Sequence, residues 1–433
     1  MSFSLITRTV AIVALLSFFC FGQDSSSIKI VPFGHASMEW GQVVQGFDKN
    51  VGDIAHVAVE RIYLGSGVNA YFSPETKFTG SLEVKAFNEF PRQVNLGRTR
   101  RYYYYFYLTQ AELVHRLFDN NGLRVDVGGG YFPYKYDDNA RNLGEYLFRS
   151  TAYPQTLTTE FDFPFARIAG LYARSSYVSG PNTINCDLIA NINTEWMAIG
   201  DLNLTMIASY NYARLFELGA GVQFGSIISA DESATTPISE YTRYLNGTDT
   251  SNSYTFRGTK LMGRFSFDPK KLIPVRDIFG NEDLKIYGEA ALLGVKNYGV
   301  ALHSPVWYNS ILERIPVMLG FNFPTFKILD VLSLEGEWWG NRYPNSMEGI
   351  VNDGLPIPFP QGTTTIDSTK YKNDNLKWSI FGAKTFAGRY RISFQAASDH
   401  MRTFAWDFQY QDWEESLHGP KKWCYVLKFG VLF

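Results

Sequence analysis

The chain has 433 residues, a formal net charge of −2 and an aromatic content of 16%, with 27 tyrosines and 34 phenylalanines. Because it carries no strongly basic field, we expect no nucleic-acid partner. Beyond the N-terminus no stretch approaches the roughly 18 uninterrupted apolar residues of a membrane helix. The aromatic content is high for a soluble protein and is typical of the interfacial girdles of membrane barrels.

Residues 1–22 predict a secretory signal peptide, cut before Gln23. Arg8 supplies the positive n-region, residues 10–21 the apolar h-region, and Cys20 and Gly22 the small residues at −3 and −1. A membrane helix is an alternative, but this apolar run is short for a bilayer. A lipoprotein anchor at Cys20 is another, although residues 17–19 lack the leucine and the small residue that such a site needs.

The chain after the cleavage site is dominated by a period of two, which is typical of strands. In residues 201–211 the apolar face carries Leu202, Leu204, Met206 and Ala208, and the polar side chains alternate with them. Segments of roughly 9–11 residues are long enough for tilted strands to cross a bilayer. Sixteen such segments are centred near Trp40, Val59, Glu83, Tyr107, Val125, Gly170, Leu188, Met206, Ala220, Leu261, Ala290, Met318, Gly336, Ile380, Ala396 and Leu427. They predict an all-β, antiparallel transmembrane barrel.

The connections alternate in length, as in barrels with short periplasmic turns and longer external loops. Short connections follow the fourth, sixth, eighth, twelfth and fourteenth strands, and long ones include residues 227–253, 341–375 and 403–422. Residues 268–283, after the tenth strand, are long for a periplasmic turn. We also expect Cys186 and Cys424, candidates for an exported disulfide, to stay unbridged, because this topology places them near opposite membrane faces.

The last strand carries one apolar face that ends on an aromatic residue. The face consists of Tyr425, Leu427, Phe429, Val431 and Phe433. It resembles the C-terminal signature by which Gram-negative outer-membrane barrel proteins are handed to their assembly machinery. The resemblance implies an outer-membrane location, with outer-membrane lipids and the barrel-assembly machinery as partners. Residues 23–433 then form a single barrel domain, since closure satisfies every backbone group in lipid. A secreted β-sandwich is the alternative.

Sixteen strands enclose more volume than side chains can fill, so the interior is expected to hold water. Ionisable and amide side chains on the inner parity support this, because a dry interior would require nearly all of them to be paired. The predicted lumen wall includes Glu112, Asp126, Arg264, Glu289, Glu335 and Gln395.

Residues 131–165 form the third external connection. General diffusion porins are sixteen-stranded, and their third external loop folds inward and narrows the barrel; this chain resembles them in strand number and loop position. The resemblance implies a constriction whose charges select ions and polar solutes, built from Lys135, Asp137, Asp138, Arg141, Glu145 and Arg149. An exposed surface loop is the alternative, but its many aromatic residues indicate that it packs on something.

Three further expectations concern this region. Residues 140–148 are expected to form two helical turns. Glycines 128–130 suit a bulge or a close backbone contact where the chain turns inward. Residues 98–101 form a basic cluster that could oppose the loop, as a basic wall opposes acidic loop residues in porins.

The function predicted is passive diffusion of small hydrophilic solutes or ions, and the porin resemblance allows a homotrimer. We expect no enzyme, no cofactor and no metal, since the six histidines are scattered and metal-binding spacings are absent. The alternative function is a structural or adhesive barrel whose external loops bind a surface ligand or polysaccharide.

Overall fold

The computed structural model describes residues 28–48, 52–56, 58–88, 102–148, 166–192, 202–228, 258–274, 276–295, 311–339, 345–346, 359–360, 375–398, 417 and 419–433. The expected signal peptide and the basic cluster at 98–101 lie outside these residues. In the described part of the chain, no helix has the length and hydropathy needed to span a bilayer.

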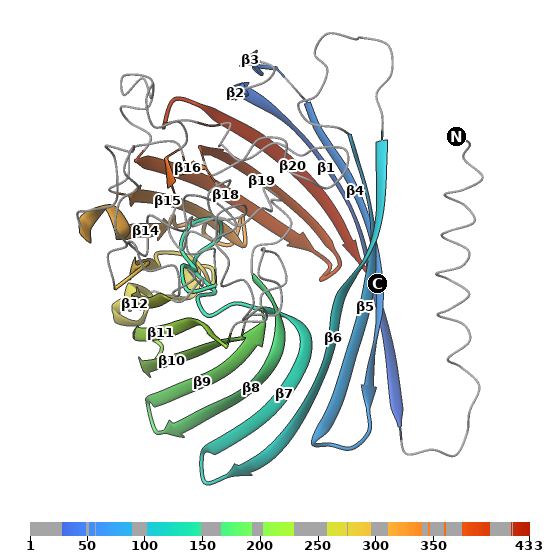
Figure 1. Ribbon diagram of the computed structural model, residues 1–433, viewed down its shortest axis with the longest axis vertical. Coiled ribbons are helices and arrows are strands. Elements are labelled where there is room, and N and C mark those ends of the chain that lie inside the picture. Colours follow the sequence, from blue (N-terminus) through green and yellow to red (C-terminus); the bar gives the residue numbers. More distant parts are fainter. Residues whose placement is uncertain are drawn as a thin grey trace, which may run out of the picture.

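Sixteen antiparallel strands close into a barrel (Figure 1). Strands that follow one another in the chain are neighbours in the ring, and the first strand also pairs with the last. Closure leaves no unpaired sheet edge, as a structure that spans lipid requires. The strands of the ring are β1 (Lys29–Gln45), β4 (Ala58–Tyr71), β5 (Thr76–Asn88), β6 (Tyr102–Asn120), β7 (Leu123–Tyr134), β8 (Ala166–Ser179), β9 (Asn182–Ile192), β10 (Leu202–Tyr212), β11 (Phe216–Ile228), β12 (Gly258–Phe267), β13 (Ile286–Leu292), β14 (Pro316–Asn322), β15 (Val331–Trp339), β18 (Leu376–Phe386), β19 (Tyr390–Ser398) and β20 (Trp423–Leu432).

The remaining elements are short. Two-stranded sheets form between β2 (Phe47–Asp48) and β3 (Gly52–Asp53), and between β16 (Asn345–Ser346) and β17 (Phe359–Pro360). The 3-10 helices are η2 (Pro269–Leu272), η3 (Arg276–Ile278) and η4 (Ile311–Arg314).

The predicted strands are confirmed, since each of the sixteen centres lies within a different strand of the ring. The short connections are tight turns; between β6 and β7, for example, Asn121 and Gly122 have φ of 52° and 80°. Positive φ at both central residues is typical of a type I′ hairpin turn, which matches the strand twist.

The long connection after β12 is an ordered turn that contains η2 and η3. The buried carboxylate of Asp283 accepts hydrogen bonds from the backbone N–H of Gly280 (2.8 Å) and of Phe326 (3.0 Å). It also accepts one from the hydroxyl of Thr325 at 2.9 Å. The extra length therefore fastens this turn to the neighbouring connection between β14 and β15.

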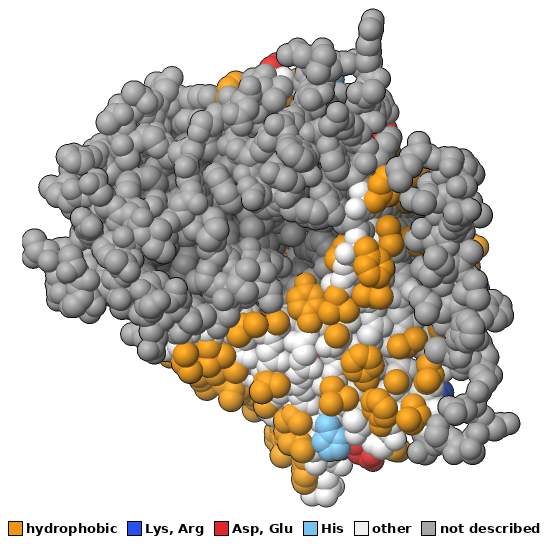
Figure 2. Space-filling model, turned by 45° about the vertical axis from the view of Figure 1, so that its right-hand side comes forward, with side chains coloured by type: hydrophobic (Ala, Val, Ile, Leu, Met, Phe, Trp, Pro, Cys, Tyr) orange, Lys and Arg blue, Asp and Glu red, His pale blue; other side chains and the backbone are white. Residues whose placement is uncertain are grey.

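The two faces of the wall differ in polarity. Along β15, Ser333, Glu335 and Glu337 are buried on the inner face, whereas Leu334 and Trp338 are exposed on the outer one. Figure 2 shows hydrophobic side chains spread over the outer surface of the described strands. An apolar outer band around a polar interior is the surface that a membrane barrel presents to lipid.

The last strand seals the ring next to the first. The backbones of Phe433 and Gly34 exchange two hydrogen bonds, of 2.7 and 2.9 Å, and the Phe433 ring lies over Gly34. The outer face of β20 carries Leu427 and Phe429, both about half exposed. Its inner face includes Cys424, which is buried, whereas Cys186 lies on the outer face of β9, and both thiols are free.

Candidate functional site: the third loop and the lumen wall

The chain that leaves β7 turns into the barrel and runs along the inner wall (Figure 1). Its described part, residues 135–148, is called the third loop below. One wall contact is Glu335 of β15, whose carboxylate accepts the backbone N–H groups of Arg141, of Asn142 (2.9 Å) and of Leu143 (3.3 Å). One carboxylate thus binds three consecutive amides of the loop.

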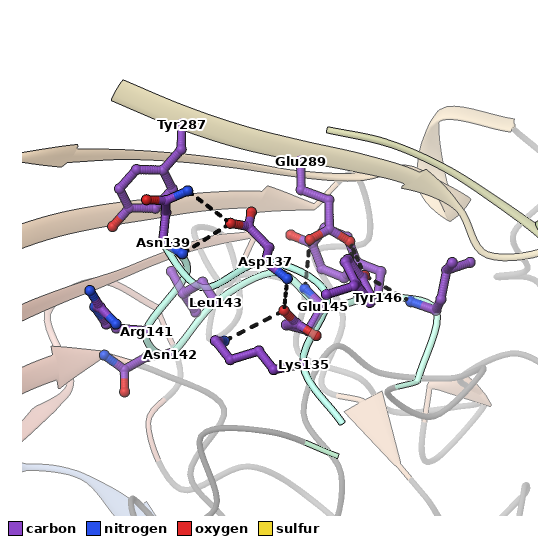
Figure 3. Close-up of polar contacts among 12 residues, drawn as sticks. Lys135, Asp137, Asn139, Arg141, Asn142, Leu143, Glu145, Tyr146, Tyr287 and Glu289 are labelled. Atoms are coloured by element: carbon purple, nitrogen blue, oxygen red, sulfur yellow. Dashed lines mark hydrogen bonds and ion pairs between the residues drawn. The ribbon is translucent and has the colours of Figure 1, made fainter. Parts of the chain in front are cut away.

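A second wall carboxylate holds the end of the turn. Glu289 of β13 accepts the backbone N–H groups of Glu145 at 2.7 Å and Tyr146 at 2.9 Å, as Figure 3 shows. The hydroxyl of Tyr136 donates to the same carboxylate. Burial, with the charges of Glu289 and Glu145 nearby, raises the pKa of the Tyr136 hydroxyl well above its ordinary value, so it remains a donor. The loop is therefore bound through its backbone N–H groups, by buried carboxyl groups of the wall.

These contacts explain why residues 140–148 do not form the expected helical turns. They form bends and a turn, with φ of 85° at Gly144 and 62° at Glu145. An α-helix needs negative φ and uses its N–H groups internally. Here the wall carboxylates take those N–H groups, so the helix prediction was wrong.

Apolar side chains of the loop complete the attachment. Ala140, Leu143 and Leu147 are fully buried and belong to one cluster with Tyr287 and Met318 of the wall. This confirms that the loop folds inward and packs on the barrel wall.

Further polar contacts fix the loop from both sides. The ammonium of Lys260 donates to the carbonyls of Tyr146 and Leu147, each at 3.3 Å. The Tyr146 hydroxyl lies 2.9 Å from Glu337, to which it donates, and the Asn142 amide donates to the Ser379 hydroxyl at 2.7 Å. The attachment therefore reaches from β12 to β18.

The predicted loop charges fall into two groups. Asp137 and Glu145 are buried: Glu145 accepts the backbone N–H of Asp137 at 2.8 Å and lies 3.5 Å from the ammonium of Lys135 (Figure 3). Asp138 is exposed, and Arg141 is partly exposed and pairs with Glu282 at 3.1 Å. Arg149 lies outside the described residues. Within this stretch, Asp137 and Glu145 shape the loop, while Asp138 and Arg141 present charge.

The six predicted wall residues lie on inner faces, and the four that do not bind the loop form side-chain contacts of their own. Glu112 accepts the Tyr172 hydroxyl at 2.5 Å, and Asp126 accepts from Arg124 at 2.6 Å. The remaining pairs are Arg264 with Glu217 and Gln395 with Ser379.

Several inner-face residues were missed, notably Lys260, Arg174 and Asp187. The strand period contains the information, because Arg174 shares the parity of Tyr172 on β8. It does not tell which inner residues meet the loop, since those contacts join positions more than a hundred residues apart.

A basic group lies on the part of the ring formed by β20, β1, β4 and β5. Glu39 is paired with Lys428 at 2.8 Å and with Arg61 at 3.5 Å. The ammonium groups of Lys85 and Lys428 lie 5.5 and 5.0 Å from the centre of the Tyr63 ring. In the strand order, β5 lies across the ring from β13, one of the strands that hold the loop, whereas β20 lies only two strands from β18, which also holds it.

The glycines at 128–130 lie in the middle of β7, which pairs with β8 as far as Tyr134, and they make close contacts. A Cβ on Gly128 would lie 2.5 Å from the Tyr172 ring, and Gly130, with φ of 126°, lies against the Ala111 carbonyl. The described bulge of this strand pair falls elsewhere, on β6 between Arg116 and Phe118. The expected close contact is thus confirmed, but there is no bulge at the glycines, and the chain leaves the wall only after Tyr134.

No protein-family model and no curated protein matches the chain. Solved structures with a similar fold include a mutant of Rh. blastica porin, with 9% identity, 94% of this chain and 100% of that chain covered, and a TM-score of 0.43. A triple mutant of Rhodopseudomonas blastica porin has 8% identity, the same coverage and a TM-score of 0.43. Similarity at this level assigns neither a family nor a function to the chain.

What the structure shows is a closed antiparallel barrel of sixteen strands with its third loop folded inward. In the described part of this barrel, no group of three or more His, Cys, Asp or Glu side chains could hold a metal ion. What the arrangement offers chemically is a polar interior in which a fixed loop and the wall present opposed charges.

Proposed function

We propose that the protein is an outer-membrane porin through which small hydrophilic solutes and ions diffuse passively. The observation that carries the proposal is the charged third loop, held by buried carboxylates inside a closed sixteen-stranded barrel. A barrel of this size leaves an aqueous interior. A loop fixed inside the barrel narrows this aqueous interior.

The proposed constriction lies between the third loop and the basic group on β20, β1, β4 and β5. Asp138 and Arg141 would present charge from the loop, and the partly exposed Lys428 from the wall. Fixed charges of both signs across a narrow aqueous path favour hydrated polar solutes and discriminate between ions. Arg149 remains a predicted member of this constriction.

The proposed address is the outer membrane of a Gram-negative bacterium. Residues 1–22 would be removed as a signal peptide, and residues 23–433 would form one barrel domain whose short turns face the periplasm. The outward C-terminal face would be the signal read by the barrel-assembly machinery. A homotrimer in outer-membrane lipid is the assembly that the porin resemblance suggests.

Planar-bilayer recording of the refolded protein tests the proposal. We expect stable unitary conductance and, in liposomes, swelling that depends on solute size. Protein denatured before addition serves as the control. A folded, inserted barrel with no conductance contradicts the porin proposal and favours the structural or adhesive alternative, which predicts retention of a surface polysaccharide by the external loops.

A further inference from the structure

A cavity of about 480 Å³ lies between the start of the third loop and the inner faces of β7 to β12. Tyr134, Tyr136 and Asp138 line it from the loop side, and Arg174, Asp187 and Arg264 are among the residues that line it from the wall. Its volume falls in the range of small-molecule sites, roughly 300–1,000 Å³. It is large enough for a small organic solute.

One wall of the cavity holds a guanidinium group between aromatic rings. The Cζ atom of Arg174 lies 4.2 Å from the centre of the Tyr172 ring and 4.9 Å from that of Tyr134. Both rings are fixed, because their hydroxyls donate to Glu112 and Asp187, each at 2.5 Å. Because Gly128 has no side chain, the Tyr172 ring can lie directly against its backbone. Such stacking orients an arginine while leaving the edges of its guanidinium plane available for hydrogen bonds.

Arg174 has hydrogen-bonding capacity left. Its Nε forms an ion pair with Asp187 at 3.8 Å, which is beyond hydrogen-bond range, and this atom has no hydrogen-bond partner among the described residues. The side chain is 37% exposed, so a solute in the lumen can reach it. A planar fork of N–H donors binds a carboxylate in a bidentate manner.

The opposite charge comes from the loop. Asp138 is exposed, lines the same cavity and forms no ion pair with any described residue. The wall carboxylates of the cavity are already engaged: Asp126 binds Arg124, Glu217 binds Arg264, and Asp187 accepts from Tyr134 and lies within ion-pair distance of Arg174. Arg174, which has unused hydrogen-bond donors, and the exposed carboxylate of Asp138 therefore line the same cavity.

We propose that this cavity binds small zwitterionic solutes, such as amino acids or short peptides with free end groups. The solute carboxylate would bind Arg174, and its ammonium group would lie near Asp138. An anion without a positive group would be repelled by Asp138, and a cation without a negative group would be repelled by Arg174. Neither therefore matches both groups. The inference rests on the proposed porin function in that solutes reach the cavity through the lumen.

Calorimetric titration of the refolded full chain in detergent tests the inference with three probes. Glycylglycine is the zwitterion, succinate the dianion and 1,4-diaminobutane the dication. We expect saturable binding of glycylglycine, with succinate and 1,4-diaminobutane at least about tenfold weaker. Equal affinity for the three probes, or no saturable binding of glycylglycine, contradicts the inference.

Variants locate the binding. Asp138→Asn and Arg174→Gln should each weaken glycylglycine binding about tenfold or more, because each removes a charged contact. Arg174→Lys, which keeps the charge but loses the fork, should also weaken it. Arg389→Gln changes an exposed arginine in the turn after β18 and should leave binding unchanged. Because the Asp138 side chain is exposed, Asp138→Asn should not disturb folding, and unchanged affinity in that variant contradicts the assignment.

The binding inference and the porin proposal can be contradicted separately, because calorimetric titration tests the first and conductance tests the second. A conducting channel that does not bind glycylglycine would leave the porin proposal standing and remove this inference. Binding of glycylglycine by a barrel that never conducts would support the binding site and contradict the porin proposal. Both results are possible because titration in detergent exposes the lumen without requiring transport across a membrane.

Discussion

At the scale of single residues, the third loop depends on carboxylates that act as acceptors for backbone amides. Glu335 takes three of these amides and Glu289 takes two, and both side chains are buried. A buried acceptor that is lost leaves its donors unsatisfied, which costs about 1–3 kcal/mol per group. The positions of Glu289 and Glu335 on the inner face follow from strand parity. Their role does not, because it arises from contacts more than a hundred residues apart in the chain.

Glu335→Gln should loosen the loop, because the amide group keeps one acceptor oxygen for three backbone donors. We expect noisier single-channel currents and faster proteolysis within the third loop, with the barrel still folded. Glu75→Gln removes a carboxylate from the exposed turn between β4 and β5 and is the matched control. Quiet currents and unchanged proteolysis in Glu335→Gln would show that the wall carboxylate does not hold the loop.

At the scale of elements, β7 and the chain that follows it decide where the loop goes. The three glycines are visible in the sequence, and a close contact there was predictable from their lack of a side chain. The conformation of residues 140–148 was not predictable. Local sequence favours helical turns, but the wall offers stronger acceptors than the loop's own carbonyls, and the backbone follows the wall.

Gly130→Ala should destabilise the barrel, because φ of 126° is strained for alanine and the new Cβ would meet the Ala111 carbonyl. Such strain costs about 1–3 kcal/mol. Gly336→Ala, whose Cβ would have nothing within 4 Å, is the control and should be nearly neutral. Thermal unfolding, followed by the gel-mobility shift of the folded barrel, measures both. Equal unfolding temperatures for the two variants would argue against a constraint at Gly130.

At the scale of the whole molecule, the barrel follows from short-range pattern and closure. Alternation with a period of two is local, and each segment shows it before any partner is known, so all sixteen strands were predictable. Closure then requires β20 to pair with β1, which it does through ten residue pairs. The site was less predictable, because side chains such as Arg174 and Lys260 acquire their roles only when distant strands meet.

Phe433→Ser should reduce accumulation of the protein in the outer membrane. Phe433 ends the outward face of the closing strand, and its ring packs over Gly34. Phe386→Ser removes another exposed ring at the same end of the barrel, close to the last residues of β20. Phe386→Ser is the control, and the amount of the heat-modifiable form in outer-membrane fractions is measured for both variants. Normal accumulation of Phe433→Ser would disprove the proposed assembly signal.

The central claim is that the third loop lines the conducting path. Labelling Asp138→Cys, in a background with Cys186→Ser and Cys424→Ser, with a charged thiol reagent during single-channel recording tests it most directly. We predict a stepwise fall in unitary conductance on labelling, and no change for Glu75→Cys in the same background. An unchanged conductance after complete labelling of Asp138→Cys would contradict the claim.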